Sequence, residues 1–430
     1  MSGAFRNIWK IDDLRRKIVF TLLLLLVYRV GGHIPVPNVD ASVLKAAGDA
    51  NNILGVLNTF SGGALQNFSV FAMSIAPYIT ASIIVQLLSM DVIPKFAEWA
   101  KEGDSGRKKL AQITRYGTVV LGLIQAIGLS VGFNRMYPGL VQDPSFTTFL
   151  VIAVTLTAGT AFLMWLGEQI TEHGIGNGIS IIIFAGIVSS IPGGITTMYA
   201  QLFYEKTKPE LFIGALQAVA ILIGIVVIIA GVIYIQQGVR KIPVQYAKRV
   251  VGNRMYGGQK THIPVKVNAA GVIPVIFASS LMMFPSTVAT FWQGNAVADW
   301  FIRNFDPRAG LYLFLFVILI VGFTYFYTFV QINPVNMAEQ MKKNSGFIPG
   351  IRPGKATSTY ITRVMNRITL VGAFFLAAVS VLPVLFGSIT GLQIYFGGTS
   401  LLIIIGVALD TMKQIENQLV MRHYQGFIKK

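Results

Sequence analysis

The chain has 430 residues, of which 53% are hydrophobic and only 12% are charged, with a net charge of +17 and a mean hydropathy of +0.63. Soluble domains carry about 25% charged residues and disordered chains need low hydrophobicity, so both classes are excluded. The absence of cysteine also excludes disulfides, thiolate metal sites and cysteine nucleophiles. An integral membrane protein remains.

Residues 1–17 precede the first apolar segment and mix apolar with charged side chains. Phe5, Ile8 and Trp9 lie among the charges, which is typical of an interfacial amphipathic helix. The apolar segment that follows resembles a signal peptide, but no small-residue cleavage site comes after it. We therefore expect an uncleaved first span.

Ten apolar segments follow one another along the chain. A helix that crosses the hydrocarbon core needs about 20 mostly apolar residues. Unbroken apolar runs without β-barrel alternation predict helices. The ten predicted spans are 18–34, 68–93, 113–133, 146–166, 179–191, 211–235, 269–291, 311–332, 368–386 and 394–409.

Residues 51–66, NNILGVLNTFSGGALQ, lie between the first two spans. The stretch is half apolar and is broken at Ser61, Gly62 and Gly63. One interpretation is an ordinary external loop, since loops usually run over the surface. The other is a short re-entrant helix buried inside the protein, because non-helical backbone at membrane depth survives only there. The residues alone favour the loop.

The basic residues are distributed very unevenly across the membrane. Ten spans place both termini on one side, together with the loops 94–112, 167–178, 236–268 and 333–367. The exceptions among the 35 Lys and Arg residues are Lys45, Arg135, Lys206, Lys208, Arg303 and Arg308 on the other side, and Arg29 inside the first span. Arg29 lies near the outer end of that span, where it can snorkel. Because basic loops stay inside, both termini are expected in the cytoplasm.

The number of spans also suggests an internal repeat. Two halves of five spans must be inverted relative to one another, as in many transport proteins. The halves share no clear sequence identity, so this prediction rests on parity. The expected organisation is an N-terminal half at 18–200, an external hinge at 201–210, a C-terminal half at 211–410 and a cytoplasmic tail at 411–430.

The sequence offers little chemistry. Apart from Arg29, the spans carry no charge before their ends, which counts against an ion-coupled transporter. Glycines at 174–178 and 350–354 lack the spacing of dinucleotide and phosphate loops. The histidines are scattered without the spacing of metal ligands. We expect no enzyme activity, no metal and no cofactor.

The loops 236–268 and 333–367 are long and basic, and the first contains no acidic residue. Membrane topology explains the sign of this charge. It does not explain loops of about thirty residues, when helix–helix connections usually have about 2–8. Such loops indicate docking of a large acidic or nucleic-acid-bearing partner.

Six longer stretches are spread over essentially the whole chain: FSGGAL at 60–65, KEGDSGRKK at 101–109, GEQITEHGIGNGISIIIFAGI at 167–187, KVNAAGVIPVIFASS at 266–280, GFIPGIRPGKAT at 346–357 and YFGGTSLLI at 395–403. All of them resemble the bacterial SecY family, the large subunits of the general protein-secretion channel. The resemblance implies an all-α polytopic membrane protein in which two inverted five-helix halves enclose an hourglass pore.

The resemblance also implies roles for particular residues. The pore would be narrowed by a ring of Ile75, Ile79, Ile179, Ile183, Ile276 and Ile403. A plug at 57–66, including Leu57, Phe60, Ser61, Gly62, Gly63, Ala64 and Leu65, would close it from outside. This implication replaces the external-loop interpretation. The second and seventh spans would form a lateral gate, with Thr80, Ile83, Gln86, Ser279 and Ser280 as candidates.

The family's partners follow in the same way. The long loops would dock the SecA ATPase or the ribosome, with Arg249, Arg254, Arg352 and Lys355 as candidates. SecE and SecG would be companion subunits, and the substrates would be signal-sequence-bearing polypeptides, some released laterally into membrane lipids. The expected location is the bacterial plasma membrane. Without the resemblance, a small-solute facilitator or a membrane scaffold without transport would remain open.

Overall fold

The computed structural model describes residues 11–47, 58, 61–90, 92–204, 208–246, 249–251, 254–256, 260–289, 295–390 and 398–428. The helices are α2 (Asp12–Gly31), α3 (Ala41–Ala47), α5 (Ala76–Leu88), α6 (Pro94–Lys101), α7 (Asp104–Met136), α8 (Phe146–His173), α9 (Gly178–Phe203), α10 (Lys208–Gln237), α11 (Ile273–Ala289), α12 (Ala296–Asn304), α13 (Gly310–Gln331), α14 (Pro334–Lys343), α15 (Lys355–Thr390) and α16 (Gly398–Ile428). The strands are β1 (Val239–Tyr246), β2 (Arg249–Val251), β3 (Arg254–Tyr256), β4 (Lys260–Lys266) and β5 (Gly346–Phe347).

Each predicted span overlaps one helix, in the order α2, α5, α7, α8, α9, α10, α11, α13, α15 and α16. Within the described residues, seven helical stretches are long and apolar enough to cross a membrane, and they include α7 to α10, α13, α15 and α16. The apolar helices α5 and α11 are shorter. Helix α2 carries Asp12, Asp13 and a basic cluster in its first turns, ahead of a long leucine run.

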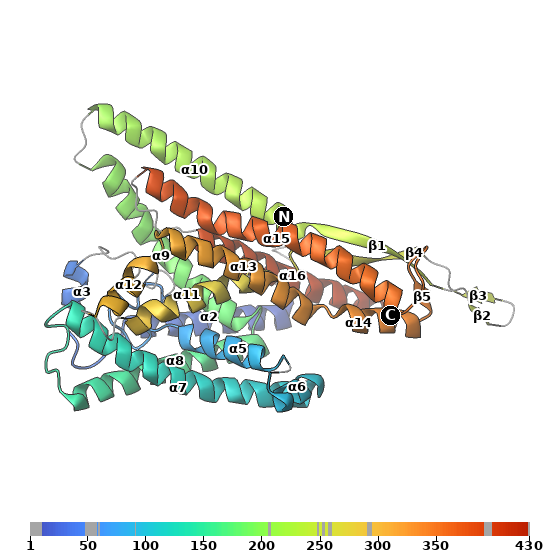
Figure 1. Cartoon of the computed structure of the whole chain (residues 1–430), viewed down its shortest axis with the longest axis horizontal. Helices are drawn as coiled ribbons and strands as arrows, with labels where there is room; N and C mark the ends of the chain where they lie inside the picture. Colours follow the sequence, from blue (N-terminus) through green and yellow to red (C-terminus); the bar gives the residue numbers. More distant parts are fainter. Residues whose placement is uncertain are drawn as a thin grey trace.

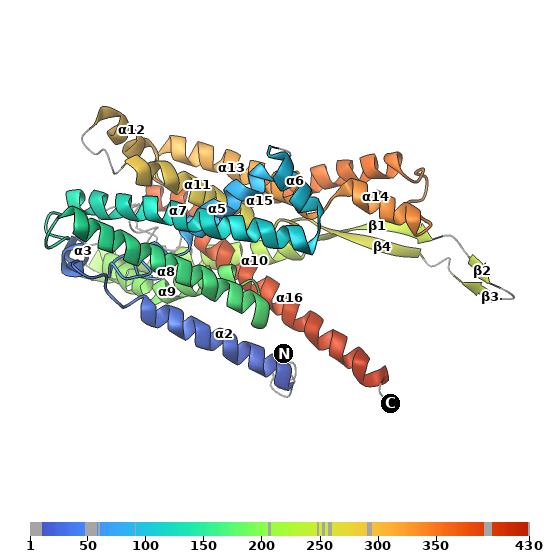
Figure 2. The same ribbon diagram turned by 90° about the horizontal axis from the view of Figure 1, so that it is seen from below.

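The long helices lie roughly side by side along the long axis of the molecule (Figure 1). The β1–β4 ribbon extends beyond one end of this bundle, and α3 and α12 lie at the opposite end (Figures 1 and 2). The beginning of α2 and the end of α16 both point toward the end that carries the ribbon (Figure 2). This arrangement agrees with an even number of crossings.

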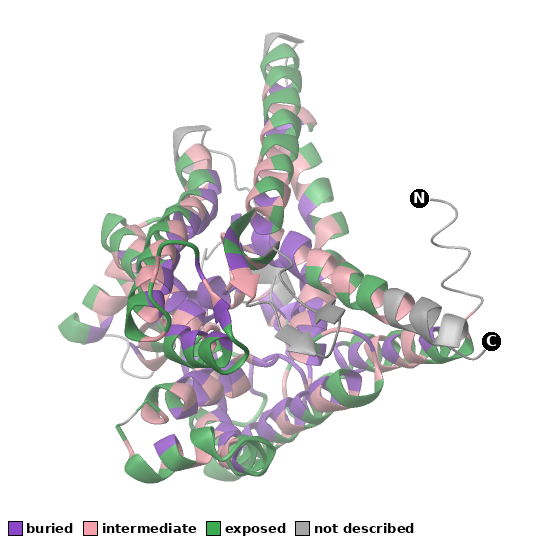
Figure 3. Cartoon of the chain, turned by 90° about the vertical axis from the view of Figure 1, so that its right-hand side faces the viewer, coloured by how far each residue is buried: buried purple, intermediate pink, exposed green. Residues whose placement is uncertain are grey.

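The bundle is held together by one large apolar cluster. It joins residues of α5, α8, α9, α11, α13, α15 and α16. In the end-on view the buried positions face the middle of the bundle and the exposed positions face outward (Figure 3). Small residues allow close contact, because a Cβ at Gly178 of α9 would collide with the carbonyl of Gly167 in α8.

The second predicted span is helical only over its latter part. Residues 68–75 precede α5 as irregular backbone, with positive φ at Phe68 and Ser74. Phe68, Phe71 and Met73 are buried in protein, which is the condition for irregular backbone at membrane depth. Hydropathy cannot separate such a segment from a helix, so the predicted start at residue 68 is corrected to Ala76.

The apolar spans are helical as expected, and the long loops add two small sheets that the sequence did not suggest. Strand β1 pairs antiparallel with β4 along its length and also with β5, and β2 pairs with β3. The alternating burial of β1 places Ile242 and Val244 inward. Pro243 lies within β1 and Pro264 within β4, although proline is disfavoured inside strands. These prolines explain why the sequence did not suggest strands.

Two other boundaries are refined. Helix α2 begins at Asp12, so residues 12–17 continue directly into the first span, whereas residues 1–10 of the expected interfacial helix lie outside the described residues. The fifth span extends as α9 to Phe203 and passes through Pro192. Within the expected hinge at 201–210, only the connection between Phe203 of α9 and Lys208 of α10 is not helical in the described residues. Residues 205–207 of this connection lie outside the described residues.

Candidate functional site

The six isoleucines expected to form a ring come together in one apolar cluster. Ile75, Ile79, Ile183, Ile276 and Ile403 are at most 7% exposed, and the half-buried Ile179 packs against the same cluster. They come from the start and first turn of α5, from α9, from α11 and from α16. Helix α11 packs against α5 and α16, and α16 packs against α9, so these four helices meet around the isoleucines.

The described part of the expected plug lies directly beside this cluster. Asn58 and Ser61 have helical backbone, and residues 62–67 form turns, whereas Leu57 and Phe60 lie outside the described residues. Ala64 is 1% exposed and belongs to the same apolar cluster as the isoleucines. Leu65, 3% exposed, packs into a neighbouring cluster with residues of α7 and α8.

Side chains of the first span and of α9 hold the plug backbone. Arg29 donates from Nη1 to the Gly62 carbonyl at 2.7 Å, and Tyr28 donates from its hydroxyl to the Ser61 carbonyl at 3.2 Å. The Ser189 hydroxyl of α9 lies 2.8 Å from the Gly186 carbonyl of its own helix and 3.3 Å from the same Gly62 carbonyl, and its one proton is shared between the two. The sequence predicted only that Arg29 snorkels and did not identify the Gly62 carbonyl as its hydrogen-bond partner. A single charge inside a span is nonetheless a sign of such a specific partner.

Gly62 and Gly63 both have positive φ, of 66° and 87°, but their surroundings differ. A Cβ at Gly62 would lie 2.6 Å from Ser189 Oγ and 2.9 Å from Gly186 Cα, whereas a Cβ at Gly63 would have nothing within 4 Å. Only Gly62 therefore needs glycine both for its backbone conformation and for close approach to α9.

Asn58 fixes the turn internally. Its carbonyl accepts from the Gly63 amide at 3.0 Å, and its Oδ1 accepts from the Gln66 amide at 3.1 Å. Ser61 Oγ donates to the Asn58 carbonyl and accepts from the Leu65 amide. The sequence-based candidates did not include Asn58, because the role of an Asn in a turn depends on which backbone groups come near it.

The candidates for a lateral gate lie on two helices in contact, α5 and α11. Thr80, Ile83 and Ser279 are buried, while Gln86 and Ser280 are half-buried. Thr80 donates to the Ala76 carbonyl and Ser279 to the Val275 carbonyl, each within its own helix. Both hydroxyls are therefore satisfied without a bond across the seam between α5 and α11.

The two long loops form one structure at the ribbon end of the molecule. Strand β5, from the second loop, pairs with β1 through Gln245 and Tyr246. Arg249 and Arg254 lie in the β2–β3 tip, which projects beyond the bundle (Figure 1). Arg352 and Lys355 lie between β5 and the first turn of α15 with exposed side chains, and the Arg352 carbonyl accepts from Thr357 Oγ1 at 2.9 Å.

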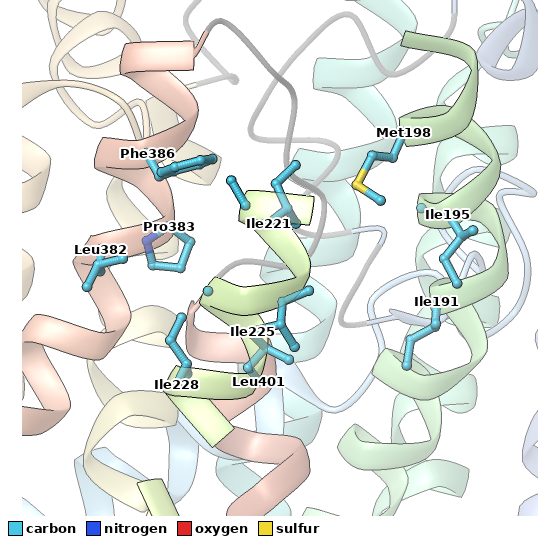
Figure 4. A pocket seen from close by; sticks show the side chains of 13 residues that line it. Ile191, Ile195, Met198, Ile221, Ile225, Ile228, Leu382, Pro383, Phe386 and Leu401 are labelled. Atoms are coloured by element: carbon cyan, nitrogen blue, oxygen red, sulfur yellow. The ribbon is translucent and has the colours of Figure 1, made fainter. Parts of the chain in front are cut away.

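An apolar pocket of about 280 Å³ lies between the outer part of α9 and the helices α10, α15 and α16 (Figure 4). Ile195 and Met198 face it from α9, and Ile221, Ile225 and Phe386 from the other side (Figure 4). No charged residue lines it. The described residues also contain no group of three or more His, Asp or Glu that could hold a metal ion.

Comparison with known proteins agrees with this geometry. The family model described as SecY matches residues 69–412. The Protein translocase subunit SecY of Halalkalibacterium halodurans is 60% identical over 432 residues, and that of Bacillus subtilis is 55% identical, each with 100% of both chains covered.

Solved structures of the same fold are more distant in sequence. A structure described as "The structure of a protein conducting channel" has a TM-score of 0.62 at 17% identity, with 94% of this chain and 93% of that chain covered. Sec61 in the canine ribosome-channel complex has a TM-score of 0.59 at 16% identity, with 94% and 93% covered. The family match and the full-length relatives lead to one conclusion: the chain belongs to the SecY family.

Proposed function

We propose that this chain is the central subunit of a protein-conducting channel that passes unfolded polypeptides across the bacterial plasma membrane. The observation that carries the proposal is the apolar cluster that brings the six isoleucines together with Ala64 of the proposed plug. An apolar constriction can gate by dewetting. Stiff β-branched side chains could close around a sliding chain without selecting its sequence.

The seam between α5 and α11 supports a second step of the same function, the lateral release of apolar helices into lipid. The gate hydroxyls of Thr80 and Ser279 bond within their own helices. Parting the two helices would thus separate packed side chains but leave those two hydroxyls hydrogen-bonded. The larger cost inside a membrane, that of an unpaired hydroxyl, would be avoided.

The energy would come from partners that dock on the ribbon end, the SecA ATPase or the ribosome, with SecE and SecG as companion subunits in the membrane. Arg352 is the strongest single candidate for docking, because its exposed charge lies where both long loops meet. Both termini would then lie in the cytoplasm, on the side of the basic loops, as the positive-inside rule predicts.

A small-solute facilitator would need polar groups that converge around the solute. The middle of the described bundle holds isoleucines instead, and the polar pocket lined by Asn177, Gln236 and Asn268 lies toward the ribbon end and does not include them. The two functions are separated by reconstituting the chain with SecE, SecG and SecA in vesicles and adding a secretory precursor. The channel predicts ATP-dependent protection of the precursor from protease. Saturable uptake of a small solute without that protection would contradict it.

A further inference from the structure

The turn between α8 and α9, residues 174–177, lies at the ribbon end, because it lines a pocket together with residues of β4. The Ile175 amide donates to Thr21 Oγ1 of α2 at 3.1 Å, and the Gly176 amide donates to Gln414 Oε1 of α16 at 2.9 Å. The turn and α2 belong to the expected N-terminal half, whereas α16 belongs to the expected C-terminal half. The second hydrogen bond therefore crosses between the halves, where Figure 2 shows the end of α8 beside α16.

The turn is shaped for close approach to α16. Gly176 has a φ of 83°, and a Cβ there would lie 2.6 Å from Ile181 Cδ1 and 3.1 Å from Thr411 Oγ1. A side chain at this position would strain the backbone and force the turn or α16 to shift. Thr411 donates to the Val407 carbonyl of its own helix at 2.7 Å, and Gln414, one turn later, supplies the acceptor for the turn.

The contact aligns two helices that carry isoleucines of the expected ring. Helix α9 begins at Gly178, directly after the turn, and Ile179 and Ile183 lie in its first two turns. Helix α16 carries Ile403 about three turns before Gln414. Since α9 packs against α16, the hydrogen bond fixes the alignment of a ring helix from one half with a ring helix from the other.

The covalent connection between α9 and α10 lies at the opposite end of α9. That helix has 26 residues, so about 39 Å separate the turn from Phe203. If one half rotated by about 5° about an axis through that connection and across α9, the turn would move by about 3 Å, enough to break a hydrogen bond. The contact between Gly176 and Gln414 is thus placed where it opposes such a rotation at the greatest distance from the connection.

The two hydrogen bonds of the turn differ in exposure. Thr21 is buried, and its hydroxyl also donates to the Lys17 carbonyl at 2.9 Å, so this side of the turn is fixed within its own half. Gln414 is exposed, so water can take over both groups when the bond breaks. A neutral hydrogen bond of this kind changes an equilibrium constant by about 2- to 10-fold. It can bias two arrangements of the halves without locking either.

We propose that Gln414 is a positioning residue that holds the turn between α8 and α9 against α16 and thereby favours the closed arrangement of the halves. Thr21 anchors the turn within its own half, and Gly176 provides the close approach. The inference rests on the proposed function, which gives opening its meaning. It adds a second joint between the halves, at the end of α9 opposite the connection to α10.

The test measures the distance across the seam between α5 and α11 in the assembled complex. The chain has no native cysteine, so spin labels at Ile84→Cys of α5 and Leu281→Cys of α11, both exposed, report the separation of the halves by double electron–electron resonance. Gln414→Met removes the acceptor at nearly constant volume. The ratio of long to short distances should rise by about 2- to 10-fold. An unchanged distance distribution overturns the inference.

Three further variants separate positioning from stability. Gln414→Glu keeps an oxygen acceptor and should restore the wild-type distances, and Gln418→Met, one turn further along α16, should leave them unchanged. Thr21→Val should lower the melting temperature, because the Ile175 amide loses a buried acceptor, but should not change the distance ratio. The proposal is wrong if Gln414→Glu fails to restore the distances, or if either Gln418→Met or Thr21→Val raises the ratio as much as Gln414→Met.

Failure of the joint and failure of the proposed function give different results. Normal ATP-dependent protection of a precursor, together with wild-type distances in Gln414→Met, excludes the joint and leaves the channel intact. No protection by the unmodified complex contradicts the channel function on which the inference rests.

Discussion

At the scale of single residues, the plug depends on a few contacts to one turn of backbone. The Gly62 carbonyl accepts from Arg29 and from Ser189, and it thereby joins the first span to α9. A hydrogen bond to a charged donor contributes about 1.5–3 kcal/mol, less where the donor is exposed as Arg29 is. Contacts of this size would hold the proposed plug closed and still let it move.

Gly62→Ala should displace the plug and raise the ion leak of the resting channel. The added Cβ would meet Ser189 Oγ and Gly186 Cα, in addition to the backbone strain of a positive φ. Gly63→Ala is the matched control, because it carries similar strain without a clash. Ion conductance in planar bilayers measures the leak. Equal conductance for the two variants would contradict the contact between plug and α9.

Arg29→Met should also raise the leak, by weakening the hold on the Gly62 carbonyl. A loss of about 1–2 kcal/mol shifts the equilibrium between closed and displaced plug by roughly 5- to 30-fold. Arg303→Met removes an exposed charge from α12, away from the plug, and is the control. Iodide efflux from vesicles reports the effect, and efflux equal to that of Arg303→Met would exclude this role for Arg29.

At the scale of elements, the proposed ring depends on four helices that meet through apolar side chains. Ile79 of α5 and Ile183 of α9 are buried in the same cluster, whereas Ile84 of α5 is 41% exposed on the outside of the bundle. One helix thus carries both a ring face and an outer face, as expected for residues five positions apart.

Ile79→Asn and Ile183→Asn should each increase ion leak and loosen the selectivity for signal sequences, because a polar side chain wets the constriction. Ile84→Asn places the same polar group on the outer face and should leave the leak unchanged. Conductance and the export of a precursor with a defective signal sequence measure the two effects. A leak in Ile84→Asn as large as in Ile79→Asn would argue against the ring.

The sequence predicted the helices more reliably than their contacts. Each apolar run marks a helix, because lipid requires internal backbone hydrogen bonds. Hydropathy placed the start of the second span eight residues too early, since residues 68–75 are apolar and mostly buried but irregular. The sheet at the ribbon end was missed because its strands contain Pro243 and Pro264 and pair over long sequence distances. The ring, plug and gate residues came from resemblance, while Asn58 and Ser189 required the structure.

At the scale of the whole molecule, the charge is concentrated where the ribbon projects. Most of the basic residues behind the net charge of +17 lie on the side of the long loops. The pairing of β1 with β4 and β5 brings these two loops together into one surface. Membrane topology explains the sign of the charge. The sheet explains how two distant loops can present it to one partner.

Reversing charges on this surface should weaken docking without disturbing the membrane part. Arg352→Glu should weaken binding of SecA or the ribosome to the complex by at least about tenfold, and the remaining affinity should depend less steeply on salt. Arg303→Glu, at the opposite end of the molecule, is the control. Co-sedimentation over a range of salt concentrations measures both quantities. An unchanged affinity for Arg352→Glu would remove this residue from the docking surface.

The central claim, that polypeptides pass through the isoleucine ring, is tested most directly by cross-linking a stalled precursor to cysteines at residues 79, 183, 276 and 403. The channel predicts that one short stretch of the precursor cross-links to all four positions, while a cysteine at the outward-facing residue 84 stays unlinked. Cross-links confined to residue 84, or an equal yield at residue 84 and at the four ring positions, would contradict it.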